Sequence, residues 1–145
     1  MRRYWVYCIG TTDSPPPPNW LEEWDHHVHE MWFPRTRRPV GVSPGDRAVI
    51  HGSDGSGFLA VVEVTSPEPE PNKTDDDYGR TRWPFVLQHR LLVGILADHN
   101  APSLDEVGWD NPRRLRRNSH VEIDQETYGR LANAVVEGAR RAVTV

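Results

Sequence analysis

The segment at residues 26–39, HHVHEMWFPRTRRP, combines three histidines with two aromatic residues and three arginines. Imidazole groups can bind a metal ion, whereas aromatic rings beside guanidinium groups are typical of nucleic-acid-binding surfaces. A zinc site needs at least three protein ligands, and HHVHE matches neither HExxH nor a Cys/His ligand spacing. We therefore expect no metal site here and interpret the histidines as the solvent-exposed face of an amphipathic helix.

A second polar group, HGSDGSG at residues 51–57, places His51 close to Ser53 and Ser56. A serine hydrolase would carry its nucleophile in a G-x-S-x-G turn between a strand and a helix, and this segment has no such turn. It also lacks the G-x-x-x-x-G-K-[ST] pattern of a phosphate-binding loop. Its glycines favour a hairpin turn with positive φ angles. We accordingly expect neither a catalytic residue nor a bound cofactor.

Two of the six tryptophans, Trp32 and Trp83, lie directly beside basic segments, in WFPRTRR and RTRWPF. A pocket for a single nucleobase has this composition, because a ring stacks on the base for about 1–3 kcal/mol and arginines hold the flanking phosphates. Two alternatives stay open: both tryptophans could fill the core, or arginines could simply stack on them. Trp20 and Trp24 fall within an apolar stripe and are predicted core residues.

The charges along the chain are segregated. The net charge of −4 argues weakly against general affinity for nucleic acids, but five of the acids lie in residues 66–77. Arginines concentrate at residues 34–39, 79–82 and 112–117. Such segregation can produce a surface with one positive face, and scattered, solvated arginines are the alternative.

Hydrophobic patterning predicts the elements that would position these residues within one domain, residues 1–145. β-Branched and aromatic runs predict strands at residues 3–9, 46–51, 58–65, 85–93 and 119–123. Helical spacing predicts a helix from residue 20 to about residue 32 after an Asn19 cap, a short helix opening with the capping box at residues 103–106, and a final helix capped by Asp124. Hairpins rather than βαβ units indicate an α+β domain with a small, mostly antiparallel sheet or barrel and helices outside it.

The expected compartment follows from what the chain lacks. No apolar run approaches the ~20 residues needed to span a membrane, and the N-terminal segment has neither the apolar stretch nor the cleavage site of a signal peptide. The single cysteine, Cys8, fits a reducing compartment, and its place in a predicted strand favours a buried, unreactive thiol. We expect a cytoplasmic protein.

Several segments resemble, in order and spacing, the motifs of the EVE domain family, which belongs to the PUA-like superfamily with the YTH and ASCH domains. YWV at residues 4–6 resembles the family's opening YWL, and PGDRAVIHGS at 44–53 resembles its GD…FYHS strand. RWP at 82–84 resembles P-[KR]-W, and RRNSHVEIDQETYGRL resembles the closing RLSIQPLTQEEF. The similarity spans roughly residues 4–137, but the loop PRTRRPVG is shorter than the family's arginine-bearing loop.

This resemblance implies a PUA-like β-barrel flanked by helices, without catalytic machinery. It implies binding to DNA or RNA, with a modified base flipped into an aromatic pocket, and a nuclease or other effector protein as a further partner. The implied pocket consists of Trp32, Trp83, His51 and Ser53, and the implied backbone contacts are Arg35, Arg37, Arg38 and Arg82. Two alternative functions are an ASCH-like nucleic-acid hydrolase and a module that binds a small molecule or a protein.

Overall fold

The computed structural model describes the chain except for residues 12, 98–99, 110–114, 116–119 and 144–145. The strands are β1 (Tyr4–Ile9), β2 (Glu30–Phe33), β3 (Arg47–Gly52), β4 (Gly57–Val64), β5 (Glu70–Pro71), β6 (Phe85–Gly94) and β7 (His120–Ile123). The helices are α1 (Trp20–Glu23), α2 (His26–His29), α3 (Asp77–Arg82) and α5 (Gln125–Val143). The basic segment at residues 112–117, apart from Leu115, lies outside the described residues.

The strands form one curled sheet in the order β2-β6-β4-β3-β1-β7, and β5 pairs with one end of β6. The β1–β3 pair is parallel, whereas the other pairs are antiparallel. The curl brings the two ends of this order together, because Phe33 on β2 lies edge-on to His120 on β7 with ring centroids 5.1 Å apart. The expected fold class, an α+β domain with a small, mostly antiparallel barrel and flanking helices, is confirmed.

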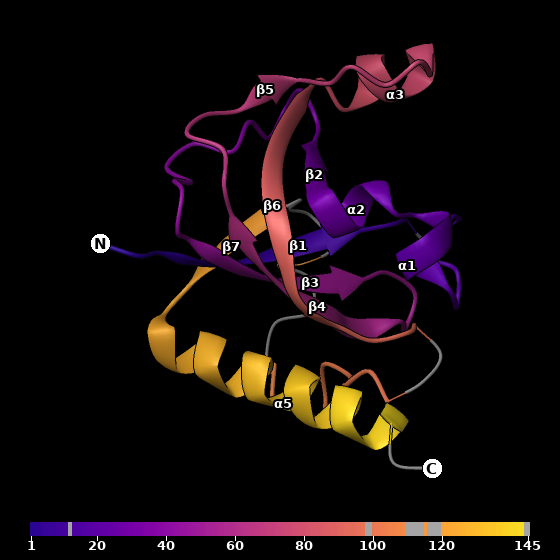
Figure 1. Cartoon of the computed structure of the whole chain (residues 1–145), viewed down its shortest axis with the longest axis vertical. Helices are drawn as coiled ribbons and strands as arrows, with labels where there is room; N and C mark the ends of the chain where they lie inside the picture. The colour runs from indigo at the N-terminus through magenta and orange to yellow at the C-terminus, as the bar shows by residue number, and fades with distance from the viewer. Residues whose placement is uncertain (12, 98–99, 110–114, 116–119, 144–145) are drawn as a thin grey trace.

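Each face of the sheet covers its own core. Inside the curl lies a cluster that includes Trp20, Phe33 and Leu87. On the outer face a second cluster joins the sheet to α5, which crosses one end of the sheet (Figure 1) and contributes Leu131 and Val135. Alternate residues of a strand point to opposite faces, so each strand serves both cores. Residues that point outward where α5 does not cover the sheet are available for other contacts.

The prediction of a single helix from residue 20 to about residue 32 is wrong. The chain forms α1, whose Asn19 cap makes no side-chain hydrogen bond, then α2, and then the strand β2. Met31 and Phe33 point into the core while Trp32 points outward, and this period of two lets β2 pair with β6. The histidines of α2 are not uniformly exposed either, because His27 is buried.

Other predicted elements agree with the structure to within a few residues, with two differences. Helix α3 was not expected; it begins where the Asp76 carboxylate accepts a hydrogen bond from the Tyr78 backbone N–H. The capping box at residues 103–106 forms, because Ser103 and Glu106 exchange hydrogen bonds, but it closes a turn rather than a helix.

Burial raises the pKa of Cys8 to about 12, as expected for an unreactive thiol. Among the described residues, no helix has the length and apolar character needed to cross a membrane.

Candidate functional site

A cleft of about 420 Å³ opens on the outer face of β2 and β6, at the end of the sheet that carries β5 and α3. Its walls come from four parts of the chain: α2, β2, the β5 segment with the loop that follows it, and β6. The lining residues are His26, Glu30, Trp32, Glu70, Pro71, Asn72, Lys73, Thr74, Val86 and Gln88. The cleft is thus an aromatic and polar site built by the pairing of β2 and β5 with the same strand.

Trp32 forms the aromatic wall of this cleft. Its indole N–H donates to Glu30 Oε1 at 2.7 Å, and the His26 ring packs against it, tilted by 33° with centroids 4.4 Å apart. Helix α3 approaches the six-membered ring of the indole, because a Cβ placed on Gly79 would lie 3.4 Å from Trp32 Cζ3. The ring is therefore held by a hydrogen bond and by packing on more than one side, which limits its rotamers before any ligand binds.

Glu30 and Gln88 form a polar pair next to this wall. They face each other across the β2–β6 ladder, and Gln88 Nε2 donates to Glu30 Oε2 at 3.1 Å. The Trp32 indole and the Gln88 amide each use one lone pair on a different Glu30 oxygen, so each oxygen can accept another hydrogen bond. The amide oxygen of Gln88 is a further acceptor. This pair consequently presents mainly acceptors to a ligand.

The loop after β5 is fixed to the end of α3. Asn72 Nδ2 donates to the Trp83 carbonyl at 2.8 Å, and its Oδ1 accepts from the Thr74 backbone N–H at 3.1 Å. Arg80 adds a hydrogen bond to the Thr74 carbonyl. These contacts hold the third wall of the cleft in place, so the shape of the cleft depends on α3.

Trp83 lies next to Trp32 but does not line the cleft. Their ring centroids are 6.2 Å apart and the planes are inclined by 41°. This separation is too small for a base to be stacked between the two rings, because each stacked contact needs about 3.5 Å. Arg82 lies over the Trp83 ring at 5.2 Å and donates to the Tyr78 hydroxyl. Trp83 therefore packs beside Trp32 outside the cleft, and Arg82 packs on the Trp83 ring.

The histidines of α2 are neighbours that differ in burial, because the rings of His26 and His27 lie 4.1 Å apart and only His27 is buried. His26 lines the cleft, and burial lowers its pKa below the ordinary value. His27 is directed into the protein, where its Nδ1 has no hydrogen-bond partner and burial lowers its pKa to about 3. No group of three or more histidine, cysteine or acidic side chains suited to a metal ion occurs among the described residues.

His51 and Ser53, which the resemblance assigns to the pocket, lie elsewhere. The His51 ring contacts Phe58, which belongs to the core beneath α5, and Ser53 Oγ donates to the Thr11 carbonyl at 2.9 Å. His51 pairs with Phe58 on β4, and six residues along β4 separate Phe58 from Val64. Val64 pairs with His89 on β6, and three more residues along β6 lead to Val86 in the cleft, nine residues in all. At ~3.3 Å per residue, the path along the strands is roughly 30 Å.

The three arginines of the loop after β2 are exposed. Arg38 lies over the Phe85 ring at 5.3 Å, and Arg37 lies close enough to His120 to contribute to the lowering of its pKa, which burial dominates. Neither these two nor Arg35 lines the cleft. The structure thus brings Trp32, Trp83 and Arg82 together, and it adds Glu30, Gln88 and Asn72, which sequence reasoning missed.

No protein-family model and no curated protein matches the chain. Solved structures share its fold: an NMR structure from Rhodopseudomonas palustris has 17% identity and a TM-score of 0.56 over 93% of this chain and 94% of that one. A crystal structure from Agrobacterium tumefaciens has 18% identity and a TM-score of 0.55 over 90% and 91%. The Mmi1 YTH domain, in complex with RNA, has 8% identity and a TM-score of 0.62 over 98% and 82%. This similarity to a YTH domain agrees with the expected PUA-like fold.

Proposed function

We propose that this protein is a nucleic-acid-binding domain of the EVE type that holds one extruded, modified base in the cleft beside Trp32. The observation that carries the proposal is the cleft itself, in which an indole ring held by its neighbours stands next to a polar pair. A fold shared with a YTH domain in complex with RNA supports the same class of ligand. The proposal includes no catalytic step.

The dimensions and chemistry of the cleft suit a base. Its volume of about 420 Å³ lies in the ordinary range for small-ligand sites. The exposed part of the Trp32 ring offers a stacking surface, and stacking with edge hydrogen bonds offsets the few kcal/mol that extrusion costs. Because Glu30 and Gln88 present acceptors, the favoured base edge is one that presents N–H donors, as the amino groups of adenine and cytosine do.

The test is a binding panel measured by fluorescence anisotropy with end-labelled oligonucleotides. The panel compares modified with plain bases, single with double strands, and DNA with RNA, at two salt concentrations. We expect one modified base to bind more tightly than its plain counterpart. Equal affinity for every member of the panel would exclude a modified-base reader, and conversion of the oligonucleotide would favour the hydrolase instead.

Variants connect this binding to the cleft. Trp32→Leu keeps an apolar side chain but removes the ring, so we expect roughly five- to 150-fold weaker binding, equivalent to about 1–3 kcal/mol of lost stacking. Glu30→Gln keeps the shape of the polar pair and should weaken binding of amino-bearing bases most. Ser53→Ala is the control, because it removes one hydroxyl far from the cleft; a loss as large as that of Trp32→Leu would place the base elsewhere.

A further inference from the structure

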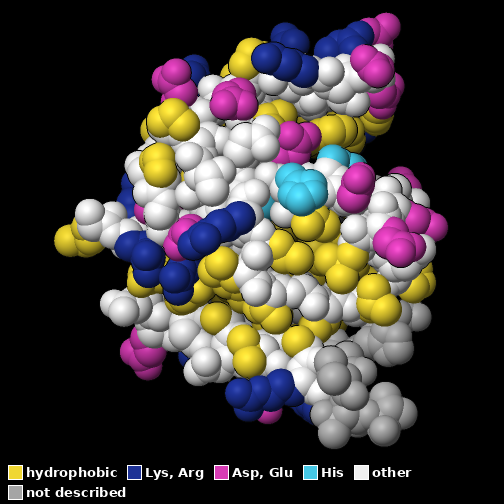
Figure 2. Space-filling model, viewed as in Figure 1, with side chains coloured by type: hydrophobic (Ala, Val, Ile, Leu, Met, Phe, Trp, Pro, Cys, Tyr) yellow, Lys and Arg dark blue, Asp and Glu magenta, His cyan; other side chains and the backbone are white. Residues whose placement is uncertain are grey.

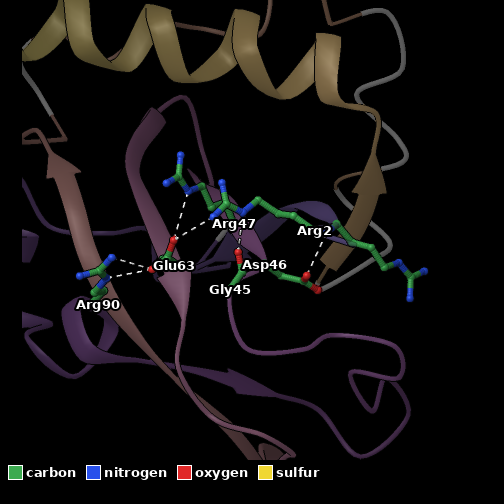
Figure 3. A network of polar contacts seen from close by, with 7 residues as sticks. Arg2, Gly45, Asp46, Arg47, Glu63 and Arg90 are labelled. Carbon is green, nitrogen blue, oxygen red and sulfur yellow. Dashed lines mark hydrogen bonds and ion pairs between the residues drawn. The ribbon is translucent and has the colours of Figure 1, made fainter.

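Three arginines surround a single carboxylate on the outer face of the sheet, beyond the cleft. Glu63 on β4 accepts from Arg90 Nη2 at 2.7 Å and from Arg47 Nε at 3.3 Å, and Arg2 Nη2 lies 3.7 Å away (Figure 3). The Arg2 Nε also donates to the Gly45 carbonyl at 2.9 Å. We call Arg2, Arg47 and Arg90 the arginine row.

The arginine row carries more positive charge than its carboxylate can balance. Glu63 is half-buried, with a side-chain exposure of 14%, whereas Arg90 is 64% and Arg2 is 44% exposed. Asp46, the other carboxylate drawn there, accepts from the Trp5 indole and from backbone N–H groups instead. Figure 2 shows basic side chains gathered beside the N-terminus and, separately, at the end that carries α3.

Stability alone does not explain this arrangement. Exposed ion pairs contribute about 0–1 kcal/mol each, and three guanidinium groups around one carboxylate repel one another. Arg90 uses its Nε and one terminal nitrogen on the same Glu63 oxygen, so further N–H donors remain on a side chain that faces solvent. Guanidinium groups with spare donors suit phosphate oxygens, which they can bind in a bidentate manner.

The arginine row continues the cleft along one strand. Val86 and Gln88 line the cleft, and Arg90 is the next residue of β6 with the same parity, so it points to the same face of the sheet. Two residues of a strand advance about 7 Å. Glu63 and Arg47 then lie opposite Arg90 across the β6–β4 and β4–β3 ladders. An elongated ligand can follow this face from the cleft to the arginine row without crossing an edge of the sheet.

We propose that the arginine row binds phosphates of the nucleic-acid strand whose base occupies the cleft. The inference rests on the proposed function and deepens it, because it gives the strand a path along the outer face of β6. This path differs from the one implied by Arg35, Arg37 and Arg38, whose loop follows the far end of β2. Contacts of the arginine row carry no sequence information, because they go to phosphates.

The test is the salt dependence of oligonucleotide binding at 50 and 200 mM salt. Each phosphate contact contributes about 0.7 to the slope of log affinity against log salt for a single strand. Arg90→Gln and Arg2→Gln should each lower the slope by about this amount, so the loss of affinity should be roughly threefold larger at 50 mM than at 200 mM. The preference for a modified over a plain base should stay unchanged.

Matched variants and folding controls make the outcomes distinct. Arg141→Gln removes one positive charge from the exposed end of α5 and should leave the slope as in the parent. Arg90→Lys should recover part of the lost affinity, because it restores the charge without the bidentate geometry. Thermal unfolding of each variant checks the fold, and Glu63 keeps two arginine partners in either single variant.

The possible failures are also distinct. If Trp32→Leu weakens binding while Arg90→Gln and Arg2→Gln keep the parental slope, the arginine row is refuted and the proposed function stands. If Arg35→Gln and Arg37→Gln lower the slope instead, the strand follows the loop after β2. If the parent protein binds no oligonucleotide at 50 mM salt, the proposed function fails, and the inference fails with it.

Discussion

His89 should make the protein lose stability as the pH falls from neutrality. Its ring lies inside the curl with 5% exposure, and its Nε2 N–H donates to the His27 carbonyl at 2.9 Å. The proton must be on Nε2, because a carbonyl can only accept, and the buried Nδ1 has no partner. A second proton would therefore place a buried charge on the ring, and burial lowers the pKa of His89 to about 4.

The size of the effect follows from this pKa. An unfolded histidine has a pKa of about 6.5, so the unfolded chain binds the proton first, and the stability present above pH 6.5 is lost as the pH falls towards 4. The difference corresponds to roughly 3 kcal/mol in total. At pH 5 nearly one proton separates the two states of His89, which gives a slope of about 1.2 kcal/mol per pH unit.

Urea unfolding at pH 7, 6 and 5 measures this slope. His89→Gln removes the titrating ring and should reduce the slope between pH 6 and 5 by about 1 kcal/mol per pH unit, whatever its stability at pH 7. His27 is present in both proteins, so its contribution largely cancels. If parent and His89→Gln lose stability in parallel, protonation of His89 is not coupled to unfolding and the reasoning is wrong.

Two further predictions concern stability. Asp46→Ala should lower the free energy of unfolding by roughly 3 kcal/mol in urea titrations, because it leaves two backbone N–H groups and the Trp5 indole N–H without their acceptor; a loss below about 1 kcal/mol would mean that water replaces the carboxylate. Gly138→Ala should lower the thermal midpoint, because its Cβ would lie 2.2 Å from the Asn100 carbonyl oxygen, whereas Gly129→Ala meets no atom within 4 Å and should stabilise α5 by about 0.5–1 kcal/mol.

The strands of the fold were predictable because their patterns are local. β1, β3, β4 and β6 are runs of β-branched and aromatic residues, and their observed bounds differ from the predicted ones by at most one residue at either end. The segment after Asn19 was not predictable in this way. Its apolar residues fit a helical stripe, and the alternation that favours β2 extends over only four residues, too few to separate the two periods. Pairing with β6 decides the outcome.

The candidate site was also predictable only where the signal is local in the sequence. Trp32 and Trp83 could be singled out because each adjoins a basic segment in the sequence, and they are neighbours in the structure. Glu30 and Gln88 carry no such local signal, because their pairing depends on the register between strands that are 58 residues apart. His51 was assigned through a motif, and the ladder of β3 and β4 places it against Phe58 instead.

The position of β1 has a consequence for how the protein is made. This strand leaves the ribosome before the strands that it pairs with, yet it is an interior strand, paired with β3 on one side and with β7 on the other. Tyr4 meets its partner Ile123 only after β7 has been synthesised. Until then one edge of β1 keeps its backbone N–H and C=O groups unpaired, the state that most readily joins other strands. The nascent chain therefore stays prone to aggregation until β7 emerges.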